Sequence, residues 1–124
     1  MLHPDIYPAI KDDRVPDDVD LSEDYKDCIF HFYLGGLIVY HKVGDRLRIH
    51  PYIHPAYRNK AKDYVMDSIN KVGQDIECLI PECYRNAKIL ALQCGGKVVG
   101  KVDNDYLHNG KWYNSIMMVR KWVS

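Results

Sequence analysis

Short apolar runs separated by glycine-containing turns dominate the sequence from residue 28 onward, and they limit the fold to a sheet-rich domain. Turn signals stand at Gly35-Gly36, Gly44-Asp45 and Asn109-Gly110. Short apolar runs bounded by such turns are typical of strands joined in hairpins. All of these runs are far shorter than the ~20 apolar residues of a membrane helix, so no membrane span is expected.

The spacing of apolar and turn residues predicts an α/β (α+β) fold with the element order β-β-β-α-β-α-β-β. Strands are expected at 28–33, 37–42, 46–50, 75–80, 97–103 and 111–120, and helices at 56–72 and 82–93. Pro51 cannot donate to a ladder, so we expect the third strand to end or to bulge there. The sheet is therefore predicted to be mixed and mainly antiparallel, with one parallel β-α-β unit at 46–80 and flanking helices.

Length and charge add further limits. The 124 residues fit a single domain, 1–124, with an acidic, proline-rich lead-in at 1–27 and a sheet-and-helix core at 28–124. The lead-in has nine acids and three bases, a net charge of −6, whereas the core has eight acids and fourteen bases, a net charge of +6. We expect the lead-in either to be solvated or to lie across the basic core. A short helix is also expected within 4–10.

The basic core can attract a phosphate-bearing ligand. It contains no run of four or more bases, so nucleic acid is not expected as a partner.

The cysteines and histidines show no metal-binding pattern. The four cysteines, Cys28, Cys78, Cys83 and Cys94, form no CxxC pair, and no Cys and His set has zinc-finger spacing. We therefore expect no metal, and reduced, mostly structural cysteines of the kind found in intracellular proteins, with a catalytic cysteine as the alternative.

Three segments of the second half resemble the GNAT superfamily of N-acetyltransferases. A strand followed by the segment from Pro55 to Asp63 resembles the family's acetyl-CoA loop, where a helix N-terminus receives the pyrophosphate. The segment from Pro81 to Ala87 resembles the family's strand-to-helix step with an asparagine. Gly95 to Gly100 resembles the glycine step and the strand after it. The closest resemblance is to short tailed-bacteriophage GNAT-like proteins, through the motifs His3-Pro4-Asp5-Ile6 and Asp12-Asp13.

The resemblance implies a reaction between acetyl-CoA, as co-substrate, and an amine. The implied pyrophosphate-binding residues are Arg58, Asn59, Lys60 and Ala61, and Asn86 would contact the pantetheine arm. The catalytic candidates are His50, His54 and Tyr84. Either histidine could accept the amine proton near neutral pH, or both could simply make local hydrogen bonds in a turn. Tyr84 is the tyrosine nearest in sequence to the family's usual proton donor.

A second hypothesis assigns the fold a role without catalysis. In this alternative the chain is a phage virion, assembly or DNA-transfer protein, and its partner is another phage protein or a second copy of itself. The expected location is the cytoplasm of the bacterial host or the virion. The lead-in and Trp122 would then be contact surfaces, because tryptophan is enriched at interfaces.

Overall fold

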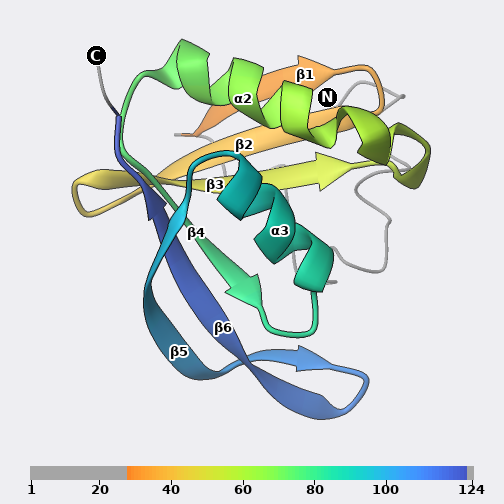
Figure 1. Ribbon diagram of the computed structural model, residues 1–124, viewed down its shortest axis with the longest axis vertical. Helices are drawn as coiled ribbons and strands as arrows, with labels where there is room; N and C mark the ends of the chain where they lie inside the picture. The colour runs from red at the N-terminus through yellow and green to blue at the C-terminus, as the bar shows by residue number, and fades with distance from the viewer. Residues whose placement is uncertain (1–27, 123–124) are drawn as a thin grey trace.

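Six strands form one mixed sheet in the order β1-β2-β3-β4-β6-β5, and helices α2 and α3 lie on one face of it (Figure 1). The computed structural model describes residues 28–122. The predicted acidic lead-in and the short helix within 4–10 lie outside the described residues. The mixed sheet and its two covering helices confirm the predicted fold class.

The observed elements follow the predicted order closely. The strands are β1 (Ile29–Tyr33), β2 (Gly36–Val43), β3 (Arg46–Ile53), β4 (Ile76–Pro81), β5 (Lys97–His108) and β6 (Lys111–Arg120). The helices are the 3-10 helix η2 (Pro55–Lys60) and the α-helices α2 (Ala61–Val72) and α3 (Arg85–Gln93). Among the described strands β3 and β4 alone pair in parallel, as predicted, and the other neighbours are antiparallel.

The prediction that Pro51 ends the third strand, or forces a bulge, is wrong. β3 passes through Pro51 and keeps its register with β2 from Arg46 to Ile53. Proline is tolerated within a strand where its missing N–H would face no neighbouring strand. β4 pairs with β3 only at Leu47 and Arg48, so no strand among residues 28–122 lies on that side of β3 when it reaches Pro51.

Three predicted boundaries also differ. The helix expected at 56–72 opens as the 3-10 helix η2, in which the Tyr57 N–H donates to the His54 carbonyl, three residues back, at 2.8 Å. The helix expected from residue 82 begins at Arg85, since the Glu82 N–H still donates to the Asn114 carbonyl of β6 at 2.9 Å. β5 continues to His108 instead of ending at 103.

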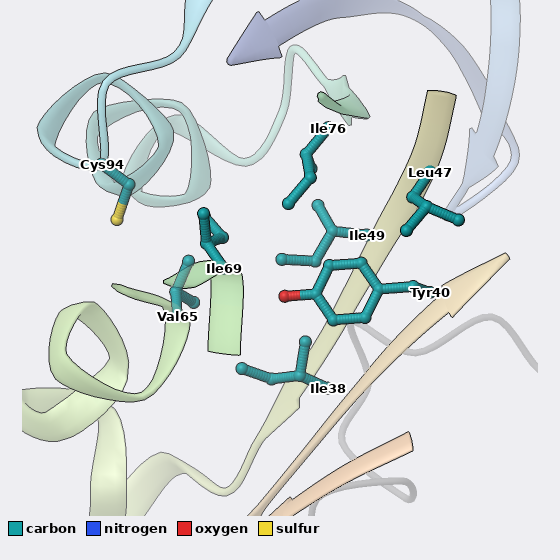
Figure 2. Packing of buried hydrophobic residues seen from close by; sticks show 8 residues of the cluster. All are labelled: Ile38, Tyr40, Leu47, Ile49, Val65, Ile69, Ile76 and Cys94. Atoms are coloured by element: carbon teal, nitrogen blue, oxygen red, sulfur yellow. The ribbon is translucent and has the colours of Figure 1, made fainter. Parts of the chain in front are cut away.

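The core lies between the helices and the central strands (Figure 2). Its members come from alternate positions of β2 and β3, from the inner face of α2, and from the starts of β4 and the α3–β5 connection. They are Ile38, Tyr40, Leu47, Ile49, Val65, Ile69, Ile76 and Cys94. No helix of the described part is long and apolar enough to cross a membrane.

A buried hydroxyl network fastens α2 to the sheet. Ser68 of α2 is fully buried, and its Oγ lies 2.6 Å from the Tyr40 hydroxyl and 2.6 Å from Nδ1 of His31. Strand β1 is thus tied to the helix as well as to β2. Such a network stabilises the fold only while each buried member keeps a partner.

Removal of the Ser68 hydroxyl is expected to destabilise the protein markedly. Ser68→Ala leaves the buried Tyr40 hydroxyl and the His31 ring without this shared partner, so the free energy of unfolding should fall by about 1–3 kcal/mol. Urea denaturation measures this change. Tyr33→Phe is the matched control, because it removes an exposed bond to Asp67, and its cost should be clearly smaller. Equal losses for the two variants would contradict the prediction.

Candidate functional site

A cleft opens where β3 and β4 diverge beneath the two helices. The two strands pair only at Leu47↔Ile76 and Arg48↔Glu77, and beyond these pairs they separate (Figure 1). The cleft has a volume of about 970 Å³. Its walls come from β3, β4, η2, α2, α3 and the β5–β6 hairpin, and most of its inner surface is aliphatic.

Unpaired backbone groups of both strands face this cleft. The Leu47 N–H donates toward β4, to Asp75, and the His54 N–H donates toward β2, to Gly35. Because successive residues of a strand alternate sides, the odd-numbered residues of β3, including Ile49 and Ile53, direct their N–H and C=O groups toward β4. Beyond Arg48, these N–H and C=O groups of β3 therefore face the cleft instead of pairing with β4.

Both prolines of the diverging strands occupy cleft-facing positions. The Glu82 N–H donates to β6, so the odd-numbered residues Leu79 and Pro81 of β4 face the cleft in the same way that Pro51 of β3 does. Neither proline has an N–H to leave unsatisfied. The cleft walls therefore carry more backbone acceptors than donors, and they suit an extended ligand with N–H groups of its own.

The η2–α2 junction forms a basic rim at the cleft. Arg58, Asn59 and Ala61 line the cleft, and Lys62 lies beside them. Lys60 is the residue that caps α2, and it does not belong to the lining residues of the described chain. Asp63, in the first turn of α2, is the one acid there. The rim attracts anions mainly through side-chain charge, because the N–H groups of Ala56, Tyr57 and Ala61 already donate within η2 or its cap.

The start of α3 places two predicted site residues at the opposite wall. Tyr84 precedes the helix and Asn86 lies in its first turn, and both residues line the cleft. The Tyr84 hydroxyl lies 2.9 Å from the Tyr106 hydroxyl of β5, and the two rings meet edge to face. The structure therefore places Tyr84 and Asn86 in one wall of the cleft.

His54 is occupied by helix capping. Its Nδ1 accepts a hydrogen bond from the Ala56 N–H at 3.1 Å. In the neutral ring the proton then resides on Nε2, and the Nδ1 lone pair bonds the turn. His54 therefore makes a local hydrogen bond in the turn, which is one of the two roles that the sequence predicted for it.

His50 is among the residues that line the cleft, but its ring lies against that of His41. Its neighbour Ile49 faces the helices, so the His50 side chain points to the opposite face of the sheet. There the His50 and His41 rings stack, and Nε2 of His50 lies 2.7 Å from Nδ1 of His41. Burial, with His41 and Arg48 nearby, lowers the pKa of His50 to about 4. His50 is therefore neutral and weakly basic at pH 7.

Two further cleft residues were not found from the sequence. Asp105 and Tyr106 line the cleft from β5. The strand was predicted to end at 103, so both residues fell in an expected loop. Nothing in their spacing marks them as part of a site.

Metal and cysteine chemistry find no support in the described residues. No group of three or more His, Cys, Asp and Glu side chains there could hold a metal ion. None of the four cysteines forms a disulfide in the described part of the chain, and burial raises the pKa of Cys78 to about 11. A thiol with a raised pKa is a poor nucleophile, which agrees with a structural role.

Comparisons with known proteins identify the fold. No known protein family and no curated protein matches the sequence. Solved structures match the fold clearly, and several N-acetyltransferases are among them. The chain has the GNAT acetyltransferase fold, as its sequence resemblance implied. None of the matches points to a phage-specific subgroup.

Three matches illustrate the likeness. Spermidine N-acetyltransferase from Vibrio cholerae, solved with CoA and spermine, has a TM-score of 0.65 at 15% identity, over 73% of this chain and 59% of that one. A GNAT phosphinothricin acetyltransferase from Sinorhizobium meliloti, solved with AcCoA, has a TM-score of 0.63 at 14% identity, over 70% and 54%. The ribosomal-protein-S18-alanine N-acetyltransferase from Escherichia coli has a TM-score of 0.60 at 14% identity, over 73% and 63%. The chain thus covers less than two thirds of each structure.

His50 is expected to make the fold sensitive to acid. Its folded pKa of about 4 lies below the ordinary value of 6.5, so between these values the unfolded chain binds a proton that the folded chain does not. The free energy of unfolding should therefore fall by about 2–3 kcal/mol from His50 alone as the pH drops from 7 to 4.5.

Urea denaturation at pH 7 and pH 4.5 tests this expectation. His50→Gln should remove most of the loss, whereas the control His108→Gln should retain it. A wild-type loss that His50→Gln leaves unchanged would refute the assignment.

Proposed function

We propose that the protein transfers an acetyl group from acetyl-CoA to an amine. The observation that carries the proposal is the open cleft between β3 and β4. Its walls present backbone groups to which an extended ligand could bond, and a basic rim lies beside it. Acetyl-CoA has a matching form, with an anionic pyrophosphate joined to a pantetheine arm that contains amide groups. Solved structures of the same fold hold CoA with spermine, or AcCoA.

The described side chains divide into two groups along the cleft. Arg58, Asn59 and Lys62, which line the cleft, would receive the pyrophosphate, and Ala61 is small enough to let it approach the helix. On the opposite wall the Asn86 amide would bond the pantetheine arm, and the Tyr84 hydroxyl would serve the sulfur end of the ligand. The thioester supplies an activated acetyl group.

In this proposal the amine proton is accepted by water or by a residue other than His50 and His54. Nδ1 of His54 accepts the Ala56 N–H, and the neutral His50 faces the other side of the sheet. Direct transfer needs a neutral amine placed close to the thioester, and the aliphatic walls of the cleft favour the neutral form. The acceptor is an amine of unspecified class in this proposal.

A second candidate function is a binding or assembly role without catalysis. It is favoured by Pro51 and Pro81, which remove two backbone donors from the cleft, and by the hydrogen bond that holds Nδ1 of His54 in the turn. The phage origin and the location in host cytoplasm or virion stay predictions from the sequence.

Calorimetric titration with acetyl-CoA separates the two functions. Selective binding over ATP is expected, and Arg58→Ala should weaken it by about 10-fold, because a charged contact is worth about 1.5 kcal/mol. Lys42→Ala, an exposed charge on β2 away from the cleft, is the matched control and should bind normally. Absence of binding at millimolar acetyl-CoA would favour the role without catalysis.

Asp63 is expected to weaken the binding of an anion at the rim. Asp63→Asn removes a carboxylate from the first turn of α2, so acetyl-CoA should bind about 2–5-fold more tightly at low ionic strength. The gain should shrink in high salt, because the side chain is exposed and its field is screened. Asp45→Asn, in the β2–β3 turn, controls for the overall change of charge. Unaltered affinity in Asp63→Asn would place the phosphates elsewhere.

A further inference from the structure

The helix η2, which carries part of the basic rim, is packed against the rest of the domain mainly through one side chain. None of its six residues is fully buried, and Tyr57 alone is half-buried, whereas Arg58 and Asn59 are exposed. A 3-10 helix this short has little stability of its own. The position of Arg58 and Asn59 at the cleft therefore depends on what Tyr57 and the residues that flank η2 contact.

The turn between β1 and β2 lies beside η2 and the start of α2 (Figure 1). The His54 N–H donates to the Gly35 carbonyl at 2.8 Å, and the Tyr64 hydroxyl donates to the Leu34 carbonyl at 2.9 Å. The Tyr57 ring lies directly against Gly35, so that a Cβ on this glycine would be only 2.2 Å from Cδ2 of the ring. The turn thus contacts the residue before η2, the middle of η2 and the first turn of α2.

Gly35 fits this arrangement for two separate reasons. Its φ of 70° lies in the left-handed region that glycine adopts without strain, and its missing Cβ lets the Tyr57 ring lie on the backbone. Gly44, in the β2–β3 turn, has a similar φ of 60°, but nothing lies within 4 Å of the position of its Cβ. A comparison of the two glycines therefore separates backbone strain from the contact with Tyr57.

We infer that Tyr57 is a positioning residue for the basic rim, and that its contact with Gly35 sets the place of η2 at the cleft. The ring on the turn fixes η2 so that Arg58 and Asn59 reach the coenzyme phosphates beside Lys62 of α2. This inference rests on the proposed function, because it requires the cleft to bind acetyl-CoA. It gives a part in ligand binding to the β1–β2 turn, which contributes none of the described residues that line the cleft.

Calorimetric titration of Gly35→Ala and Gly44→Ala with acetyl-CoA tests the inference without requiring turnover. In Gly35→Ala the added methyl group must displace the Tyr57 ring, so binding should weaken by about 5–10-fold, the loss expected for one misplaced charged contact. Gly44→Ala introduces a similar strain without the collision, and its affinity should stay within about two-fold of wild type. Urea denaturation should give a lower midpoint for both variants, because alanine is strained at a positive φ. Loss of stability then cannot account for a difference in affinity.

Variants of Tyr57 give a second test that leaves the turn unstrained. Tyr57→Ala should weaken acetyl-CoA binding as much as Gly35→Ala does, whereas Tyr57→Phe keeps the ring and should bind like wild type. In the double variant Gly35→Ala/Tyr57→Ala the methyl group has no ring to displace, so affinity should fall no further than in Tyr57→Ala. Ser68→Ala, which loses stability at a residue outside the cleft lining, should bind normally.

The outcomes separate the inference from the function on which it rests. Failure of the wild type to bind acetyl-CoA would overturn the proposed function and the inference with it. If the wild type binds, three results would each overturn the inference alone. They are equal affinities in Gly35→Ala and Gly44→Ala, normal binding by Tyr57→Ala, and an additive loss of affinity in the double variant.

Discussion

The short parallel contact between β3 and β4 governs the rest of the structure. The strands share two residue pairs, and the Arg48–Glu77 contact, at 3.6 Å with Glu77 only 4% exposed, lies where they part. A buried carboxylate needs a partner, so this contact is costly to break and fixes the apex of the divergence. Beyond it the strands present backbone groups to a cleft instead of to each other, and α2 and α3 cover the gap from one side (Figure 1). The candidate residues that line the cleft are arranged around this opening: Arg58, Asn59, Ala61, Tyr84 and Asn86.

Much of the fold could be predicted from the sequence, because local signals agreed with each other. Gly35 and Gly44, both with positive φ, and Gly73 after α2 mark the turns and the helix end, and the alternation of apolar residues marks the strands between them. Pro51 was misread because the sequence does not show which edge of a strand lacks a neighbour. The rule that proline avoids central strands still holds here. β3 is central at Leu47 and has an open edge at Pro51.

The candidate site was predictable only where it lies within one local motif. Arg58, Asn59 and Ala61 follow a strand and open a helix, and they do line the cleft. Asp105 and Tyr106 line the cleft through the pairing of β5 with β6, whose register shifts between Val102 and Tyr106, and the sequence of β5 alone does not specify that register. Likewise His54 has the residue type of a base, but its tautomer is set by the Ala56 N–H, a contact that only the folded turn provides.

The way in which the helix opens shapes what the rim can bind. A glycine-rich loop offers a phosphate free N–H groups and close approach to the backbone. Here the 3-10 helix η2 occupies the position of such a loop, and the N–H groups of Ala56, Tyr57 and Ala61 already donate hydrogen bonds within η2 or its cap. Attraction for an anion therefore depends on exposed side chains, above all Arg58. Because exposed charges act through water and are screened by salt, coenzyme affinity at this rim should depend on ionic strength far more than it would in a backbone cradle.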